Sequence, residues 1–336
     1  MGMDTKSTIT IYDVAREAGV SMATVSRVVN GNPNVKPSTR KKVSDVIERL
    51  NYRPNAVARG LASKKTTTVG VITPSITNLF FSSLARGIDD IATMYKYNII
   101  LANSDDTKEK EITVFHNLLA KQVDGIIFMG YDVNDQLRQE IENSSTPVVF
   151  AGTSTGDYDF YSVNIDDDLA VEDAISRLLK AKTRPALVTG PADFLSNQAT
   201  IKGYKDALTK QGQEIDDNLI VSTSRTYKEA DVIVDELLAN QATSVLVTHD
   251  DVAAAILNAL VNRGVKVPED FMVVASHNSI ITELVRPQLT SIEIPLYDIG
   301  AVAMRLLTKV MNKEEVDEKK LLLAHKIKER ESTQFK

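Results

Sequence analysis

The chain has 336 residues, no cysteine, a formal net charge of −6 and 43% hydrophobic residues. This length suggests two or three compact units, and the lack of cysteine excludes disulfides, cysteine-based zinc sites and thiol catalysis. Residues 1–8 lack the apolar centre of a signal peptide and no apolar run is long enough for a membrane span, so we expect a cytoplasmic protein without a membrane partner.

The net charge hides an asymmetry along the chain. Residues 1–65 carry 12 Lys and Arg against 5 Asp and Glu, whereas the remainder carries 27 against 40. A basic head on an acidic body favours binding of nucleic-acid phosphates by the head alone.

The first predicted unit is a helix-turn-helix. Helices are expected over residues 11–18 and 22–29, with Thr10 and Ser21 as their capping residues. Gly19 tolerates the positive φ of a sharp turn, and Val25 faces back towards the first helix. This leaves the start of the second helix outward, where such a unit enters a major groove. A surface helical hairpin without DNA contact is the structural alternative.

Two further helical stretches follow. Residues 34–39 are read as a turn and the start of a third helix, whose apolar stripe includes Val43 and Leu50, so three helices can close one small core. Residues 55–62 are then expected to form a helix of barely two turns that contains Gly60, and such a helix is marginal in water. We expect a second copy of the chain and a DNA groove to stabilise it.

From Thr66 onward, apolar strands alternate with helices. Strands of the first series are expected at 68–74, 98–103, 125–130 and 147–152, and those of a second series at 186–189, 219–223, 245–249 and 272–276. Strands that are apolar on both faces belong in parallel sheets covered by helices on both sides. The pattern therefore predicts two α/β lobes, with a ligand cleft at the carboxyl ends of their strands.

A search for catalytic and metal-binding patterns gives no strong candidate. The four histidines show no metal-ligand spacing, and no phosphate-binding glycine loop or nucleophile elbow follows a strand. The run Asp166–Asp168 could hold a magnesium ion, but it fits the caps of a helix better. We expect no enzymatic activity and no required cofactor.

Residues 8–65 resemble the DNA-binding headpiece of the LacI/GalR family of bacterial repressors. The resemblance lies in residues 10–21 (TIYDVAREAGVS), 24–30 (TVSRVVN) and 52–61 (YRPNAVARGL). The order of elements in the remainder is similar as well. The resemblance implies an all-α helix-turn-helix headpiece and a hinge helix, joined to a two-lobe α/β body of parallel sheets like that of periplasmic binding proteins.

The family fold also implies domain boundaries. The headpiece would span 1–53 and the hinge helix and linker 54–65. The chain would cross between the lobes near 162–165, 290–294 and 322–325. The first lobe of the effector and dimerisation body would then comprise 66–163 with 294–322, and the second lobe 164–293 with 323–336.

The resemblance implies a homodimer that binds double-stranded, pseudo-palindromic operator DNA. Leu61 is expected to act as an apolar wedge at a base step, with Ala58 near the groove floor. The residues expected to contact DNA are Ser21, Met22, Ala23, Thr24, Arg27, Asn30, Ala58 and Leu61.

The cleft departs from the pattern of sugar- and purine-responsive relatives. Thr200 stands where those relatives tend to have Arg, and His277 stands where they tend to have Asp; Asp250 follows His249 at the end of another strand. The loss of a guanidinium and a carboxylate removes groups suited to sugar hydroxyls or a purine. Either other side chains replace them, or the main effector is not a cleft ligand.

Within the family, residues 21–24, 94–101 and 297–309 resemble the regulators of carbon catabolite control. That likeness implies a protein corepressor, the serine-phosphorylated form of the phosphocarrier HPr, with a sugar phosphate as an auxiliary effector. The residues expected to bind it are Tyr297, Asp298, Val302, Arg305 and Lys309, with Arg305 on the phosphate. The alternatives are a repressor controlled by a sugar or nucleoside in the cleft and, less favoured, a sugar-binding transport protein.

Overall fold

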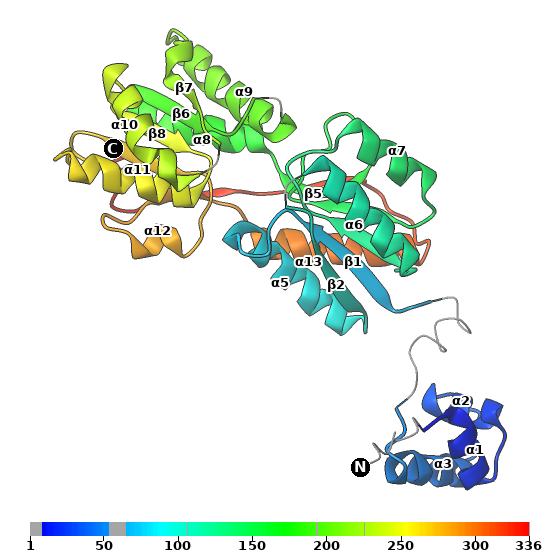
Figure 1. Ribbon diagram of the computed structural model, residues 1–336. Coiled ribbons are helices and arrows are strands. Elements are labelled where there is room, and N and C mark those ends of the chain that lie inside the picture. The colour runs from blue at the N-terminus through cyan, green and yellow to red at the C-terminus, as the bar shows by residue number, and fades with distance from the viewer. Residues whose placement is uncertain (1–8, 54–64, 106, 193, 225, 336) are drawn as a thin grey trace, which may run out of the picture. The chain divides into compact units, whose positions relative to one another are not determined.

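The computed structural model describes residues 9–53, 65–105, 107–192, 194–224 and 226–335 (Figure 1). The chain divides into two compact units, residues 1–66 and 67–336. The expected hinge helix at 55–62, with Ala58 and Leu61, lies outside the described residues.

The first unit is a bundle of three short helices, α1 (Ile11–Ala18), α2 (Met22–Val29) and α3 (Pro37–Arg49). Gly19 has φ +59°, so the tight turn after α1 uses the left-handed conformation that favours glycine. The helices share one apolar core, formed by Val14, Ala15, Ala18, Val25, Val28, Val43 and Val46. The predicted bounds of α1 and α2 are confirmed.

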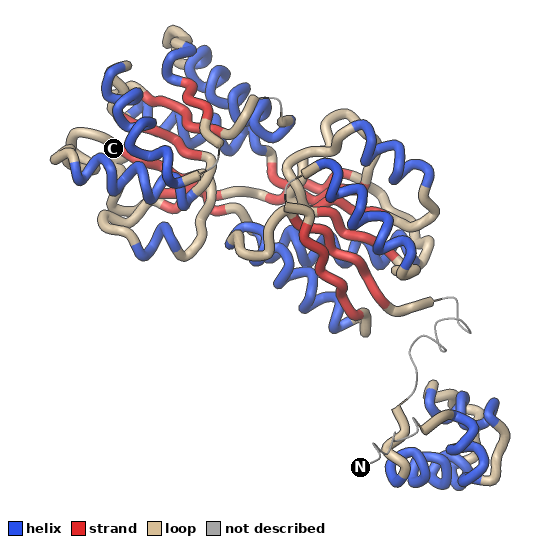
Figure 2. Tube along the Cα trace, in the orientation of Figure 1, coloured by secondary structure: helices blue, strands red, loops and turns tan. Residues whose placement is uncertain are grey.

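The second unit contains two six-stranded sheets, each the centre of one lobe (Figure 2). The first sheet is parallel throughout, in the order β11 (Lys320–Leu323), β5 (Tyr161–Ile165), β4 (Val148–Ala151), β3 (Gly125–Phe128), β1 (Thr68–Thr73) and β2 (Asn98–Asn103). Alternate residues of a strand point to opposite faces, so each face needs its own cover. One face packs on α5 (Leu79–Met94) and α13 (Leu296–Met311), and the other on α6 (Lys108–Ala120) and α7 (Asp135–Asn143).

The second sheet has the order β12 (Lys326–Lys328), β10 (Thr290–Glu293), β9 (Met272–Ala275), β8 (Ser244–Val247), β6 (Pro185–Thr189) and β7 (Ile220–Ser222). β12 is antiparallel to β10, and the other pairs are parallel. The helices of this lobe are α8 (Asp167–Lys180), α9 (Leu195–Lys210), α10 (Ala230–Ala239), α11 (Asp250–Asn262) and the short α12 (Ile281–Leu284). Two 3-10 helices, η1 (Asp217–Leu219) and η2 (Tyr227–Glu229), complete it.

The expected lobe boundaries need a small correction. β5 continues to Ile165, so residues 164 and 165 belong to the first sheet and not to the second lobe. Leu323 pairs with Ile165 in the same sheet, whereas the sequence placed it on the second lobe. Strand β11 pairs with β5 along residues 162–165 and so belongs to the first lobe. After β11, the chain returns to the second sheet with β12.

Helices α5 and α13 cross at very short range on the first lobe. A Cβ atom added at Gly87 would lie 2.0 Å from the backbone oxygen of Tyr297, and one added at Gly300 would lie 2.1 Å from that of Leu84. Only glycine allows the two backbones to approach so closely. This contact holds the segment 296–311 against the first lobe, although strands β1 to β5 of that lobe lie much earlier in the sequence.

Candidate functional site

The helix-turn-helix is fixed by local caps at both helix starts. The Asp13 carboxylate accepts the backbone N–H of Thr10 at 3.0 Å and its hydroxyl at 2.7 Å, so these two residues close the first turn of α1. The hydroxyl oxygen of Ser21 accepts the N–H of Thr24 at 3.2 Å and thereby caps α2. The predicted capping role of Ser21 is confirmed.

The outward side of α2 matches the expected DNA-reading side. Ser21, Met22, Ala23, Arg27 and Asn30 are exposed, while Val25 and Val28 are buried in the core. Thr24 is half-buried, and its hydroxyl lies 2.9 Å from that of Ser21. The helix thus presents small side chains, one thioether and one guanidinium, a set that can approach base edges in a major groove closely.

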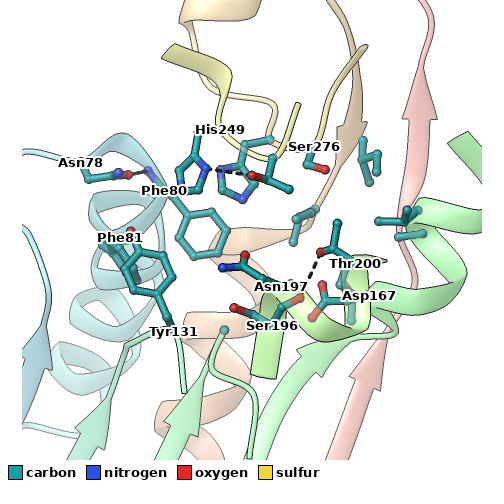
Figure 3. Close-up of a pocket in the computed structure, with 18 of the residues that line it drawn as sticks. Asn78, Phe80, Phe81, Tyr131, Asp167, Ser196, Asn197, Thr200, His249 and Ser276 are labelled. Carbon is teal, nitrogen blue, oxygen red and sulfur yellow. Dashed lines mark hydrogen bonds between the residues drawn. The ribbon is translucent and has the colours of Figure 1, made fainter. Parts of the chain in front are cut away.

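A second candidate site is a cavity of about 100 Å³ between the two lobes (Figure 3). Its apolar walls include Phe80, Phe81 and Tyr131 from the first lobe and Ile292 from the second. Its polar lining comes largely from the second lobe, where Ser196, Asn197, Thr200, Thr248, His249, Ser276 and His277 contribute. No Lys or Arg is among the described residues that line it.

The cavity brings together some, but not all, of the expected cleft residues. Thr200 and His277 line it, whereas Asp250 does not. The buried Asp250 carboxylate instead accepts the N–H groups of Ser279 and Asp251, so it fixes the loop behind His277. Asp250 was expected to face the cleft, and the structure corrects this. As the first residue of α11, it binds backbone N–H groups instead.

Several residues of this cavity were not among the expected cleft residues. Asp167, Tyr131 and His249 each follow a strand of a parallel sheet, so their position at the carboxyl end of a strand was the available signal. The capping interpretation of the Asp166–Asp168 run is confirmed for Asp166, which accepts the N–H of Leu169 at 3.0 Å. Asp167 itself points into the cavity (Figure 3).

Two ionisable groups of the cavity are perturbed in opposite ways. Burial, helped by the negative charges of Asp168 and Asp166, raises the pKa of Asp167 to about 7. Burial lowers the pKa of His277, against the smaller opposing effect of the Asp250 carboxylate. His277 is therefore neutral near pH 7, and Asp167 exchanges its proton in the same range.

The third candidate site is the outer side of α13. Tyr297, Asp298, Arg305 and Lys309 are exposed and Val302 is half-buried, as a helix packed on one side requires. The Tyr297 hydroxyl donates to the Asp90 carboxylate of α5 at 3.1 Å, which raises the pKa of Tyr297. The side chains of Arg305 and Lys309 form no hydrogen bond or ion pair with another described residue.

Within the part of the chain that the structure describes, no helix has the length and apolarity needed to cross a membrane. The same residues contain no group of His, Asp and Glu side chains arranged to hold a metal ion.

Comparison with known proteins identifies the family. The model of bacterial regulatory proteins of the LacI family matches residues 10–55, and the model of periplasmic binding proteins and the sugar-binding domain of the LacI family matches residues 66–331. The chain belongs to the LacI family. Because the DNA-binding headpiece and the effector body both match, the fold predicted from the sequence is confirmed.

Curated relatives extend over nearly the whole chain. Catabolite control protein A of Streptococcus mutans is 54% identical over 98% of this chain and 100% of that protein. The protein of the same name from Priestia megaterium is 53% identical over 97% of this chain and 99% of that protein. The chain is therefore a DNA-binding transcription regulator of carbon catabolite control.

Solved structures agree in fold. The transcription regulator CcpA of Lactococcus lactis is 46% identical, with a TM-score of 0.77 over 80% of this chain and 99% of that one. A lac repressor dimer bound to operator and an anti-inducer is 26% identical, with a TM-score of 0.88 over 97% of this chain and 99% of that one. LacI-family regulators thus include proteins that bind operator DNA as dimers.

The first prediction concerns Arg27, the exposed cation of α2. If its guanidinium forms a bidentate contact with a guanine, Arg27→Ala should weaken operator binding by about 1–3 kcal/mol. Binding to random DNA should change much less. Titration of both DNAs at one fixed salt concentration measures this difference, and an equal loss on both would identify Arg27 as a phosphate contact instead.

The second prediction concerns Asp167. Its pKa of about 7 lies above the ordinary value of 3.8, so ionisation of Asp167 opposes folding as the pH rises from 3.8 to 7. Asp167→Asn removes that ionisation. The variant should gain thermal stability relative to the wild type as the pH rises through this window, and the gain should level off above pH 7.

Thermal unfolding of both proteins between pH 4.5 and 8.5 provides the test. Asp157→Asn is the matched control, because this exposed carboxylate lies outside the Asp166–Asp168 run and its replacement leaves the ionisation of Asp167 in place. A stability difference for Asp167→Asn that does not vary with pH would show that Asp167 is ionised normally in the folded protein.

Proposed function

We propose that this regulator binds pseudo-palindromic operators as a homodimer and that serine-phosphorylated HPr is its corepressor. The observation that carries the proposal is the exposed pair Arg305 and Lys309 on α13, whose charged groups have no partner among the described residues. The full-length relatives named for catabolite control support it. No catalytic step is part of this function.

The α13 surface has the chemistry to bind a phosphorylated protein. Arg305 and Lys309 lie one turn apart, so both cations can reach one phosphate group. The planar fork of Arg305 matches two phosphate oxygens, while Lys309 adds a second positive charge. Val302 lies one turn before Arg305 and offers an aliphatic contact beside the charges.

This surface is also held rigidly. The close approach of α13 to α5 at Gly87 and Gly300, together with the hydrogen bond from Tyr297 to Asp90, fixes the helix to the first lobe. A site on a fixed helix does not lose the ordering entropy that a flexible loop would lose on binding. The same contacts place Tyr297 and Asp298 at the start of the surface, where they can meet the protein part of the corepressor.

Exposed apolar side chains support the dimer. Tyr95 follows α5, and Leu101 lies on β2, the edge strand of the first sheet. In the second lobe, exposed apolar residues lie on and near α11 and α12, namely Val261, Ile280 and Leu284. Burial of such surface against a second copy would bring two headpieces to one DNA, and the twofold symmetry of the dimer would then require a pseudo-palindromic operator.

The alternative function is control by a sugar or nucleoside in the interlobe cavity. The polar side chains at the start of α9, including Ser196 and Thr200, favour it, since they could bind hydroxyl groups. A sugar phosphate fits less well, because the described lining offers no guanidinium or ammonium group for the phosphate.

The third prediction separates these two functions. Arg305→Ala should abolish the strengthening of operator binding by serine-phosphorylated HPr and should leave binding by the regulator alone unchanged. An effector strengthens DNA binding only through its preference for the DNA-competent arrangement, so removal of its anchor removes that coupling. Operator titrations with and without phosphorylated HPr measure the effect.

Two matched variants make the test specific. Arg305→Lys keeps the charge but not the fork, so it should retain only part of the stimulation. Thr200→Val changes the cavity and should retain all of it. Loss of regulation in Thr200→Val together with normal regulation in Arg305→Ala would overturn the proposal and favour a cleft ligand.

A further inference from the structure

Aromatic rings from the two lobes meet inside the cavity. Phe80, at the start of α5 in the first lobe, stacks on His277, which follows β9 in the second lobe; their ring centroids are 4.4 Å apart and the planes differ by 31°. The ring centroid of His249 lies 5.6 Å from that of His277, and the ring centroid of Tyr131 in the first lobe lies 6.4 Å from that of His249. In Figure 3, Phe80 projects from the α5 side towards the histidine side of the other lobe.

The first-lobe ring is positioned by its own backbone and by close neighbours. The Asn78 side chain accepts the N–H of Phe80 at 2.8 Å and caps α5 there. Phe81 meets the Phe80 ring edge-on at 5.1 Å. A Cβ atom at Gly152 would lie 3.5 Å from the Phe80 ring, an ordinary van der Waals distance, so the chain at Gly152 also lies close to the ring.

The loop that carries the His277 ring is held by hydrogen bonds to the next residue. The residue after His277 is Asn278, whose side-chain oxygen accepts hydrogen bonds from Arg330 and Ser291, each at 2.8 Å. The Arg330 side chain is only 6% exposed and also pairs with Glu283 at 3.0 Å. The C-terminal segment, β10 and α12 thus converge on the loop that presents His277.

The charge state of His277 favours its contact with the Phe80 ring. Because burial lowers the pKa of His277, the imidazole is neutral at pH 7 and stacks on Phe80 without the cost of a buried cation. Asp250, whose negative charge acts on this imidazole, accepts the N–H groups of Ser279 and Asp251.

We propose that the Phe80–His277 contact is a built-in latch that holds the two lobes closed without a cleft ligand. In many two-lobe proteins a bound ligand supplies the contacts between the lobes. Here two side chains of the protein supply them. Phe80 and His277 therefore determine which molecules can bind in the cleft, because such a molecule must displace their contact. An effector on α13 acts without displacing it.

A distance measurement between the lobes tests the latch. The chain has no cysteine, so Gln139→Cys on α7 and Gln213→Cys after α9 introduce two exposed labelling sites, one on each lobe. Spin-labelled protein is diluted into an excess of unlabelled protein, so that labels in a second copy do not contribute. Pulsed electron spin resonance then gives the distribution of interlobe distances without DNA, HPr or small molecules.

The fourth prediction is that the wild type shows one narrow distance. Phe80→Leu and His277→Asn should each increase the ratio of open to closed lobes by about 2- to 12-fold, the change that corresponds to ~0.5–1.5 kcal/mol for a ring pair. Phe80→Leu keeps most of the apolar volume, so the lobe should remain folded. Thermal unfolding of each variant checks this.

Phe160→Leu is the matched control. Phe160 is half-buried like Phe80 and stacks on Phe150 at 5.3 Å, but both rings belong to the first lobe. The control should therefore keep the narrow interlobe distance. An unchanged distribution in Phe80→Leu and His277→Asn, or a broad distribution already in the wild type, would overturn the latch. Neither result depends on whether HPr is the corepressor.

Discussion

The backbone contact between α5 and α13 is the constraint on which the functional surfaces of the body depend. Gly87 and Gly300 lie where any side chain would collide with the opposite backbone. Their absence of a Cβ atom lets a helix from the C-terminal part of the chain pack on the first lobe. Arg305 and Lys309 owe their fixed outward position to this packing, since the buried side of α13 leaves the helix a single orientation.

Helix α5 also connects two sites that look separate in the sequence. Its middle contacts α13, where the proposed corepressor surface begins at Tyr297. Its first turn carries Phe80 into the interlobe cavity, against His277. One rigid helix thus takes part in both the outer surface and the interlobe contact, so a partner bound to α13 and the arrangement of the lobes share a structural element. Coupling between the two sites would require two arrangements of the lobes, both of which this helix contacts.

Much of this structure followed from local sequence rules. The helix-turn-helix was predictable to the residue because each signal is short-range: Ser21 caps its own helix, Gly19 makes its own turn, and Val25 recurs at helical spacing. The boundaries of the lobes were less predictable, because β11 pairs with a strand about 160 residues earlier and no local pattern shows that pairing. The cavity was the least predictable part. The stacking of Phe80 on His277, the burial that shifts the pKa of Asp167, and the role of Asp250 behind the loop depend on which strand ends meet, and that is decided by the tertiary fold.

The central claim is that regulation reaches the DNA-binding function from a protein bound outside the cleft. The most direct measurement is the affinity of the purified protein for operator DNA at one salt concentration, alone, with unphosphorylated HPr and with serine-phosphorylated HPr. The account predicts that only the phosphorylated form tightens binding, by about 5- to 150-fold, the usual range of coupling between two sites. Equal operator affinity in all three conditions, together with tighter or weaker binding on addition of a small sugar or nucleoside, would contradict it.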